Sequence, residues 1–378
     1  MEYKKIIIPL ILSVFLLSMT YVSAGEMDNK IASKDTDSIE LSADRDIIVD
    51  NLQTSEENNT FAVEENDETL SSETDSEILT ADQLTYTNLR EQIGSGGNIN
   101  LIKGTYTYNN DDGETIQIST SGVINGNGAV IDMAKSGHRA FYVTTSGVTI
   151  KNLTIKNANY NGYGGAIYFT ISGTVTNCNF NNNKATSDSS GGGAVYFDDE
   201  GTVTNCNFNN NSARYGGAVY IYSNGEVTNC NFTNNNASED GGAVWRRSGT
   251  VTNCNFINNT ATSRGGAIRF YDFGFGSVTN CNFTNNKATG EGGDGDGGAI
   301  QMFYEGSVSN CNFTDNTAKS CGAIKINRGN VTNCNFNNNS ARYGGAVLFL
   351  NSGEVTNVIL ITTMQHMVVQ FTSLIRVR

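Results

Sequence analysis

The chain contains a single proline, Pro9, among its 378 residues. Proline removes a backbone donor from a β-ladder, so its absence from the rest of the chain suits continuous backbone pairing. A basic surplus is also absent, because 24 Lys and Arg stand against 38 Asp and Glu, which argues against nucleic acid as a partner. No apolar run reaches the roughly 20 residues of a membrane-spanning helix. We therefore expect no membrane span in the mature chain.

The first 24 residues have the three parts of a secretory signal peptide. Lys4 and Lys5 precede the apolar run Ile6–Met19, and Val22–Ala24 follows as a cleavage site. The alternative is an uncleaved N-terminal anchor, for which the run is short. We predict an exported protein that is secreted or displayed at the extracellular cell surface.

Residues 25–80 differ in composition from everything that follows. Glu26–Thr80 holds 17 acidic and three basic residues, a net charge of −14 that equals the net charge of the whole chain. Such a segment is too charged and too poor in aromatic residues to bury a core. We predict a disordered acidic linker; an arm that binds cations or a partner is the alternative.

The remainder of the chain carries an internal repeat. Asn-Cys-Asn-Phe occurs seven times, Phe-x-x-Asn-x-Ala follows each time, and Gly-Gly-Ala-Val or Gly-Gly-Ala-Ile recurs between the cysteines. The stretch VTNCNFNNNSARYGGAV occurs at both Val203–Val219 and Val331–Val347. A unit that stacks on its own neighbours is needed many times, unlike an active site. The repeat cysteines are Cys178, Cys206, Cys230, Cys254, Cys281, Cys311 and Cys334.

Each unit of about 26 residues holds short β-prone runs broken by Gly and Asn, with no helical period. Three short strands per unit fit one coil of a parallel β-helix, whereas propeller blades need about 40 residues and leucine-rich repeats need regularly spaced Leu. We predict an all-β solenoid of about 10 coils over residues 81–357. Upstream, Asp82–Ile93 places Leu84, Leu89 and Ile93 near one helical face, which predicts a helix that caps the first coil.

Equivalent residues of successive coils should form rows about 4.8 Å apart. We expect the repeat phenylalanines to stack inside, and the first asparagine of Asn-Cys-Asn-Phe to form corners and an amide ladder. The cysteines should be buried thiols, because this spacing exceeds the roughly 3.8 Å Cβ separation that a disulfide prefers; bridged pairs are the alternative. Cys321 replaces a repeat glycine, and its thiol is a candidate for exposure. The ladder asparagines are Asn177, Asn205, Asn229, Asn253, Asn280, Asn310 and Asn333.

The pairing of Gly-Gly-Ala-Ile/Val with Phe-x-x-Asn resembles the repeat of the chlamydial polymorphic outer-membrane proteins. The whole layout of signal peptide, acidic stretch, cap and Asn-rich coils is more similar to the adhesin-like surface proteins of methanogenic archaea. The resemblance covers about Thr85–Asn357. It implies a surface-displayed, right-handed parallel β-helix that contacts other cells or glycans. Both families usually continue into further C-terminal modules, and this chain departs from them there.

Residues 358–378 break the pattern. After Asn357 the repeat promises Cys-Asn-Phe, but VILITTMQHMVVQFTSLIRVR follows, without Gly or Asn. Adding one base after codon 357 of one possible coding sequence restores the repeat as NCNFNNNNATYGGAVYIINPGT. We hypothesise a one-base deletion, so that the tail is the frame-shifted remnant of another coil. The nucleotide sequence beyond codon 357 tests this.

The best binding candidate is a row of side chains, one per coil, directly after the Val or Ile of Gly-Gly-Ala-Val/Ile. The residue beyond each is apolar in nearly every coil, so the row itself should face outward. Its first four members would form a flat, exposed aromatic strip suited to stacking on sugar rings or a partner chain. The alternative is that they only stabilise cross-strand pairing. The row is Tyr168, Tyr196, Tyr220, Trp245, Arg269, Gln301, Lys325 and Leu348.

Nothing in the sequence gathers the carboxylates that polysaccharide lyases and hydrolases need. Asp198–Glu200 fits a solvated turn, His138 an ordinary surface residue, and Gly292–Gly298 a loop better than a calcium-binding nonapeptide. We predict no enzyme, no cofactor and no metal. The predicted function is adhesin-like binding of cell-surface glycans or other cells, with a polysaccharide lyase or glycoside hydrolase as the alternative. The oligomeric state is left open.

Overall fold

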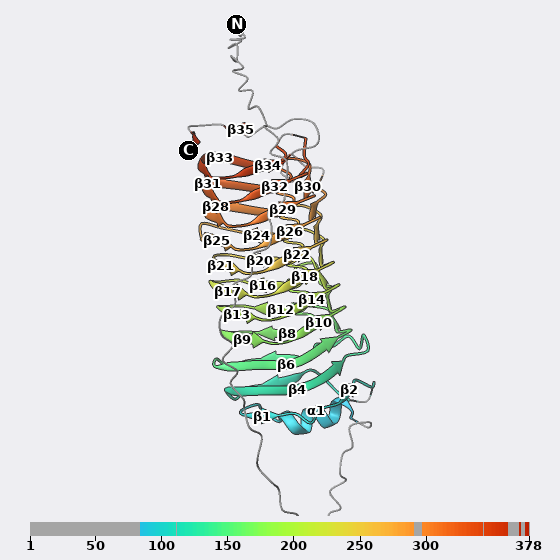
Figure 1. Ribbon diagram of the computed structural model, residues 1–378. Coiled ribbons are helices and arrows are strands. Elements are labelled where there is room, and N and C mark those ends of the chain that lie inside the picture. The colour runs from blue at the N-terminus through green and yellow to red at the C-terminus, as the bar shows by residue number, and fades with distance from the viewer. Residues whose placement is uncertain are drawn as a thin grey trace, which may run out of the picture. The chain divides into compact units, whose positions relative to one another are not determined.

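The computed structural model describes residues 84–110, 112–290, 297–342 and 344–361, together with strand residues 370–371 and 375–377. The predicted signal peptide, the acidic linker, most of Gly292–Gly298 and most of the tail lie outside the described residues. The described chain forms a right-handed parallel β-helix of about ten turns, as predicted (Figure 1).

A complete coil contains four short strands, and each pairs in parallel with its equivalents in the neighbouring coils. In one coil these are β12 (Val195–Phe197), β13 (Gly201–Thr204), β14 (Asn207–Asn209) and β15 (Ser212–Ala213). The sequence predicted three strands per coil, and the structure has four. The fourth strand has only two residues, too few to leave a period in the sequence, and it builds a separate sheet.

The strands form four columns, in which some long strands span two columns. The first column holds β3 (Ile116–Ile118), β5 (Phe141–Val143), β8 (Ile167–Phe169), β12, β16 (Val219–Ile221), β20 (Val244–Arg246), β24 (Ile268–Phe270), β28 (Ile300–Ser309), β31 (Ile324–Thr332), β33 (Val347–Thr356) and β35 (Gln370–Phe371). The second holds β1 (Ile99–Asn100), β4 (Gly122–Asp132), β6 (Val148–Lys156), β9 (Gly173–Thr176), β13, β17 (Gly225–Thr228), β21 (Gly249–Thr252), β25 (Phe275–Thr279), the second halves of β28, β31 and β33, and β36 (Ile375–Val377). The third holds β2 (Thr105–Thr107), the second halves of β4 and β6, β10 (Asn179–Asn181), β14, β18 (Asn231–Thr233), β22 (Asn255–Ile257), β26 (Asn282–Thr284), β29 (Asn312–Thr314), β32 (Asn335–Asn337) and β34 (Ile359–Ile361). The fourth holds β7 (Asn159–Tyr160), β11 (Lys184–Ala185), β15, β19 (Asn236–Ala237), β23 (Thr260–Ala261), β27 (Lys287–Ala288) and β30 (Thr317–Ala318).

Residues with positive φ turn the coils that carry Gly-Gly-Ala-Val or Gly-Gly-Ala-Ile at three corners. The first corner is the predicted asparagine of Asn-Cys-Asn-Phe, as at Asn205 with φ 53°. The second lies five residues later, as at Asn210 with φ 55°, and was not foreseen. Asparagine tolerates this left-handed region better than other non-glycine residues. The third corner requires glycine: at Gly164, with φ 61°, a Cβ would lie 2.2 Å from the carbonyl oxygen of Ile167.

The core is built from the predicted rows. The repeat phenylalanine rings stack with centroids 4.8–5.0 Å apart and planes within 8° of parallel. The repeat cysteines are buried thiols without disulfides; for example, the Cys230 thiol donates to the carbonyl of Thr228 at 3.2 Å. Cys321 is also buried, so its candidacy for exposure was wrong. Its thiol turns inward and donates to the carbonyl of Ile324 at 3.0 Å.

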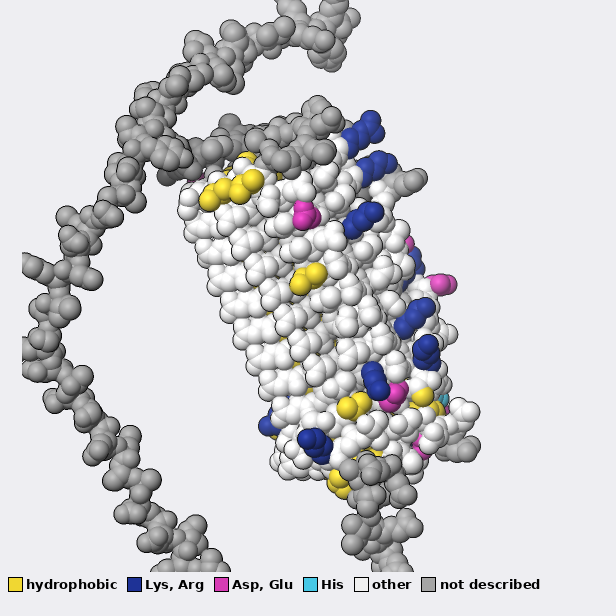
Figure 2. All heavy atoms as spheres, turned by 45° about the vertical axis from the view of Figure 1, so that its right-hand side comes forward, with side chains coloured by type: hydrophobic (Ala, Val, Ile, Leu, Met, Phe, Trp, Pro, Cys, Tyr) yellow, Lys and Arg dark blue, Asp and Glu magenta, His cyan; other side chains and the backbone are white. Residues whose placement is uncertain are grey.

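Three asparagine ladders run along the solenoid. The predicted corner ladder is confirmed where Asn229 donates to Asn205 at 3.1 Å. A buried ladder uses instead the asparagine of Phe-x-x-Asn: Asn235 Oδ1 accepts from both the backbone N–H and the side-chain Nδ2 of Asn211 at 3.0 Å. An exposed ladder includes the 2.8 Å bond from Asn231 to Asn207. Figure 2 shows a face with few hydrophobic or charged side chains, on which most of the Lys and Arg side chains lie along the right-hand edge.

Helix α1 (Tyr86–Ile93) caps the first coil, next to β1 and β2 (Figure 1). It begins later than the predicted Asp82, because Thr85 forms a capping box with Asn88. Leu84, Tyr86, Leu89 and Ile93 join the core. Within the described residues, no helix is long and apolar enough to cross a membrane.

The first residues of the tail still continue the solenoid. In β34, Leu360 lies opposite Phe336 of the preceding coil, so an aliphatic side chain takes the place of the repeat phenylalanine. Ile359 and Ile361 are 57% and 58% exposed. The frame-shift hypothesis stays a prediction.

Candidate functional site

Along each strand of the first column, successive side chains alternate between the core and the outer side, as predicted. Phe169, Phe197 and even Arg246 point into the core and are almost fully buried. The neighbouring row lies on the outer side of the strands, in the register Tyr168–Tyr196–Tyr220–Trp245. The four predicted aromatic residues therefore do form one continuous row.

The rings of this row stack on one another along the solenoid axis. Centroids are 4.6 Å apart between Tyr196 and Tyr220 and 4.2 Å apart between Tyr220 and Trp245, with interplanar angles of 11° and 6°. Tyr168 meets Tyr196 edge to face at 5.1 Å. Tyr196 and Trp245 are only 5% and 6% exposed. The expectation of an exposed flat strip was wrong for these two, because the neighbouring rings cover their faces.

The aromatic row is longer than predicted. Upstream, Tyr142 lies 5.4 Å from Tyr168. Downstream, where the strand position becomes Arg269, the loop residue Tyr271 continues the stack, 5.4 Å from Trp245. Arg269 is 1% exposed, and its guanidinium carbon lies 5.6 Å from the centroid of the Tyr271 ring.

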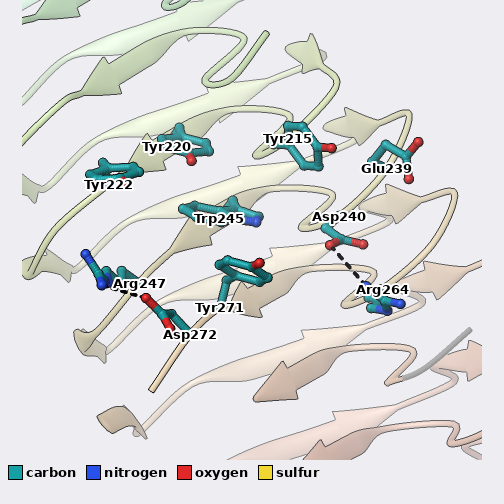
Figure 3. Close-up of a pocket in the computed structure, with 10 residues that line it drawn as sticks. All are labelled: Tyr215, Tyr220, Tyr222, Glu239, Asp240, Trp245, Arg247, Arg264, Tyr271 and Asp272. Atoms are coloured by element: carbon teal, nitrogen blue, oxygen red, sulfur yellow. Dashed lines mark ion pairs between the residues drawn. The ribbon is translucent and has the colours of Figure 1, made fainter. Parts of the chain in front are cut away.

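A hollow of about 420 Å³, here the Trp245 hollow, opens beside this stack. Figure 3 shows Tyr222, Arg247 and Asp272 on one side of the Tyr220 and Trp245 rings. On the other side are Tyr215, Glu239, Asp240 and Arg264. The lining residues are Tyr215, Tyr220, Tyr222, Glu239, Asp240, Trp245, Arg247, Arg264, Tyr271 and Asp272, from three successive coils.

Ion pairs hold the charged groups of the Trp245 hollow in place. Arg247 pairs with Asp272 at 2.6 Å, and Asp240 Oδ2 lies 3.7 Å from Arg269 Nε and 4.0 Å from Arg264 Nη1. Asp240 Oδ1 is buried and has no hydrogen-bond partner in the described part of the chain. Burial raises the pKa of Asp240, although the two arginines act in the opposite direction.

A second hollow of about 680 Å³, here the Arg139 hollow, lies at the N-terminal end of the row. Tyr168 lines this hollow, Tyr220 and Trp245 line the first, and Tyr196 lies between the two. The lining residues are Glu114, Thr115, Gln117, Gly137, His138, Arg139, Tyr142, Tyr160, Gly162, Tyr163 and Tyr168. The structure thus divides the predicted strip between two sites.

The other sequence candidates do not gather into a site. Asp198 and Glu200 are exposed, and Asp198 accepts hydrogen bonds from the hydroxyls of Tyr168 and Tyr196 at 3.4 Å. His138 is half-buried and stacks on Tyr108 at 5.4 Å. No three His, Cys, Asp or Glu side chains among the described residues are arranged to hold a metal ion.

Sequence reasoning missed Tyr142, Tyr271 and Arg139. Tyr142 occupies the row position of an earlier coil, and extending the register upstream through Ala140–Asn157 would have found it. Tyr271 belongs to a loop of variable length, and Arg139 precedes a coil without the Gly-Gly-Ala signature. Neither of these two leaves a periodic signal.

The fold agrees with the family profile that matches this chain. The family profile described as right handed beta helix region matches residues 139–340. Among solved structures, the chain is similar to tailspike protein 3 of bacteriophage CBA120, with 13% sequence identity and a TM-score of 0.31. The match covers 78% of this chain and 58% of the tailspike chain, so the chain spans little more than half of that protein. No curated protein matches the sequence.

Proposed function

The chain belongs to the right-handed beta helix family, and from this premise we propose that it is an adhesin-like protein that binds glycans in the Trp245 hollow. The signal-like N-terminus and the resemblance to adhesin-like surface proteins support a place outside the cell, secreted or at the cell surface. The observation that carries the proposal is a hollow that combines partly exposed aromatic rings with fixed charged groups. Its partners would be cell-surface glycans or other cells.

The chemistry of the hollow suits a sugar ring. Tyr222 and Tyr271 are 49% and 45% exposed, so their rings offer apolar faces to the C–H side of a sugar. Arg247 and Asp272 are oriented by their ion pair and can donate to and accept from sugar hydroxyls. A volume of about 420 Å³ lies within the range of about 300–1,000 Å³ typical of small-molecule sites.

The predicted site residues take different roles in this proposal. Tyr220 and Trp245 form the floor of the hollow through their edges. Tyr196 supports the floor by stacking on Tyr220. Tyr168 borders the Arg139 hollow instead.

The decisive experiment pairs a glycan array with calorimetry on single variants. Tyr271→Ala removes an exposed ring from the hollow, and we expect its affinity for the best array ligand to fall about tenfold or more. Phe273→Ala is the matched control, because Phe273 is 73% exposed on the same loop but does not line the hollow. Equal effects of the two changes would reject the site, and an array without any ligand would reject glycan binding.

One observation favours glycan cleavage as a second candidate function. Asp240 is a buried carboxyl group with a raised pKa in the hollow, as a general acid for glycoside hydrolysis requires. Its ion pairs with Arg264 and Arg269 oppose this role, because they hold the carboxylate in its charged form. A reducing-end release assay decides: release that is lost in Asp240→Asn would establish glycan cleavage through Asp240, and no release leaves binding as the function.

A further inference from the structure

We infer that the Arg139 hollow binds the acid group of an acidic sugar, so that the recognised glycan carries carboxylate or sulfate groups. The inference rests on the glycan binding proposed above, and it names the class of glycan and a second binding residue. It is carried by a buried cation that lines a hollow and has no anionic partner among the described residues.

Arg139 is 6% exposed, yet it lines a hollow of about 680 Å³. Its guanidinium lies 3.8 Å from the ring centroid of Tyr160, and Nη2 donates to the carbonyl oxygen of Tyr163 at 2.7 Å. A contact from strand β7 (Tyr160) and one from the loop that follows it (Tyr163) therefore fix the side chain where it borders the hollow. A binding group held in this way loses little freedom when a ligand arrives.

The hydrogen-bonding capacity of Arg139 is largely unused. A guanidinium has five N–H donors, and the bond from Nη2 to Tyr163 is the one formed within the described residues. Nε is buried and has no hydrogen-bond partner in the part of the chain that the structure describes. Among the described carboxylates none lies within ion-pair distance of Arg139; Glu114, the acidic residue that lines the same hollow, is exposed and does not pair with it.

The surrounding tyrosines compensate the charge only in part. Arg139 also lies 5.0 Å and 5.5 Å from the ring centroids of Tyr168 and Tyr142. Cation–π attraction is weaker than the cost of taking a cation out of water, so a buried arginine is normally matched by an anion. Burial accordingly lowers the pKa of Arg139. A carboxylate or sulfate in the hollow would supply the missing anion and accept from the planar fork of donors.

The position of the hollow indicates that this anion belongs to a glycan. Tyr168 lines the hollow and also begins the aromatic stack that leads through Tyr196 and Tyr220 to Trp245. Tyr168 and Trp245 are three coils apart, about 14 Å at the usual strand spacing. One extended oligosaccharide can therefore reach both hollows, with a sugar ring against Tyr271 and an acid group against Arg139.

The test compares two forms of one ligand on the full-length chain. Calorimetry measures the binding of a galacturonic acid hexamer and of the same hexamer with its carboxyl groups methyl-esterified, which removes the charge and keeps the sugar. We expect the acidic form to bind about tenfold or more tightly. Arg139→Gln should abolish this preference, and Arg139→Lys, which keeps the charge but not the fork, should retain part of it. Arg328→Gln is the control, because Arg328 is an exposed arginine that pairs with Glu305 elsewhere on the wall.

The outcomes separate the inference from the proposal on which it rests. Equal binding of the two hexamers by the native chain, or a preference that survives Arg139→Gln, overturns the acidic-sugar assignment and leaves glycan binding intact. Binding of neither hexamer, together with an empty glycan array, overturns both. Acetate and sulfate test whether the hollow binds any free anion. If they compete with the hexamer at the hexamer's own concentration, the hollow is an anion site without sugar recognition, and the acidic-sugar assignment is also overturned. If Arg139→Gln fails to fold, two other measurements decide. One is the binding of both hexamers by Arg139→Lys, and the other is whether the native chain loses its preference for the acidic hexamer at high salt.

Discussion

The ring of Tyr220 lies 4.2 Å from the ring of Trp245, with the two planes 6° apart, so each covers one face of the other. Such a stack contributes to stability whether or not a ligand binds. It explains why residues that alternation places outside the solenoid wall are nevertheless buried. A binding defect in this row therefore has to be separated from a folding defect.

Truncation of the row should lower stability. We expect Trp245→Ala to lower the free energy of unfolding by about 3–5 kcal/mol, because it leaves a cavity between two stacked rings. Phe273→Ala, which removes a ring that is 73% exposed, should change it by about 0.5 kcal/mol or less. Urea denaturation followed by circular dichroism measures both. Similar values for the two variants would show that the stack does not stabilise the fold.

Ligand binding should change the fluorescence of the chain. Trp245 is the sole tryptophan, and it lines the proposed glycan site. Titration with the glycan that binds best on the array should therefore shift or quench the emission, and the midpoint should equal the calorimetric dissociation constant. Unchanged emission at saturation would place the glycan elsewhere.

The buried and exposed asparagine ladders should differ in their contribution to stability. Asn235→Ala leaves the backbone N–H of Asn211 and the carbonyl of Phe208 without their side-chain partner, at about 1–3 kcal/mol for each buried group. Asn231→Ala removes an exposed 2.8 Å bond in the same coil and should cost about 1 kcal/mol or less. Chemical denaturation of both variants measures the two losses of unfolding free energy. A larger loss for Asn231→Ala than for Asn235→Ala would contradict the prediction.

Arg246 should stabilise the core despite its charge. Its guanidinium is fully buried and donates to the carbonyls of Ser248 (3.0 Å), Thr250 (2.7 Å) and Gly225. The equivalent residue two coils later is Met302. Replacing a buried charge by an apolar residue can stabilise a protein, but Arg246→Met would leave these carbonyls without a donor. We expect a net loss of about 2 kcal/mol or more, and a variant with a higher melting temperature would contradict this.

The aromatic row should also make the stability of the fold sensitive to alkaline pH. Burial, and secondly the nearby Asp198 carboxylate, raise the pKa of Tyr168 to about 12, compared with about 10 in an unfolded chain. The folded state therefore holds the proton more tightly. Its stabilising contribution is complete below pH about 10 and is lost as the pH rises towards about 12. Tyr168→Phe should flatten this part of the stability profile, measured by denaturation between these pH values; an unchanged slope would contradict the shift.

Much of the fold could be predicted because stacking turns a repeat into rows. The Phe, Cys and corner Asn rows follow from position alone, since each coil places equivalent residues in equivalent environments. Alternation correctly assigned the side of the strand for Tyr196 and Trp245 but could not show what covers them. That depends on ring orientation and on Tyr271, which lies in a loop without a period.

The binding candidates were harder to predict for the same reason. Arg139 and Asp240 are candidates because both are buried, and because Arg139 Nε and Asp240 Oδ1 have no hydrogen-bond partner within the described residues. Neither property is periodic, and both arise where loops of different coils meet. Of the four aromatic residues named from the sequence, Tyr168 borders one hollow, Tyr220 and Trp245 border the other, and Tyr196 lies between them. The groups that would recognise a ligand came from the structure.

The corner residues have a consequence for how such a chain can change. In the coils that carry Asn-Cys-Asn-Phe, the first two corners are five residues apart, as at Asn205 and Asn210 or Asn280 and Asn285. All variation in coil length, from 23 to 30 residues between cysteines, falls in the remaining part of the coil. Both hollows lie in that part. Insertions there can reshape the recognition surface one coil at a time, while the fixed segment keeps every row in phase, so specificity can diverge without any new folding problem.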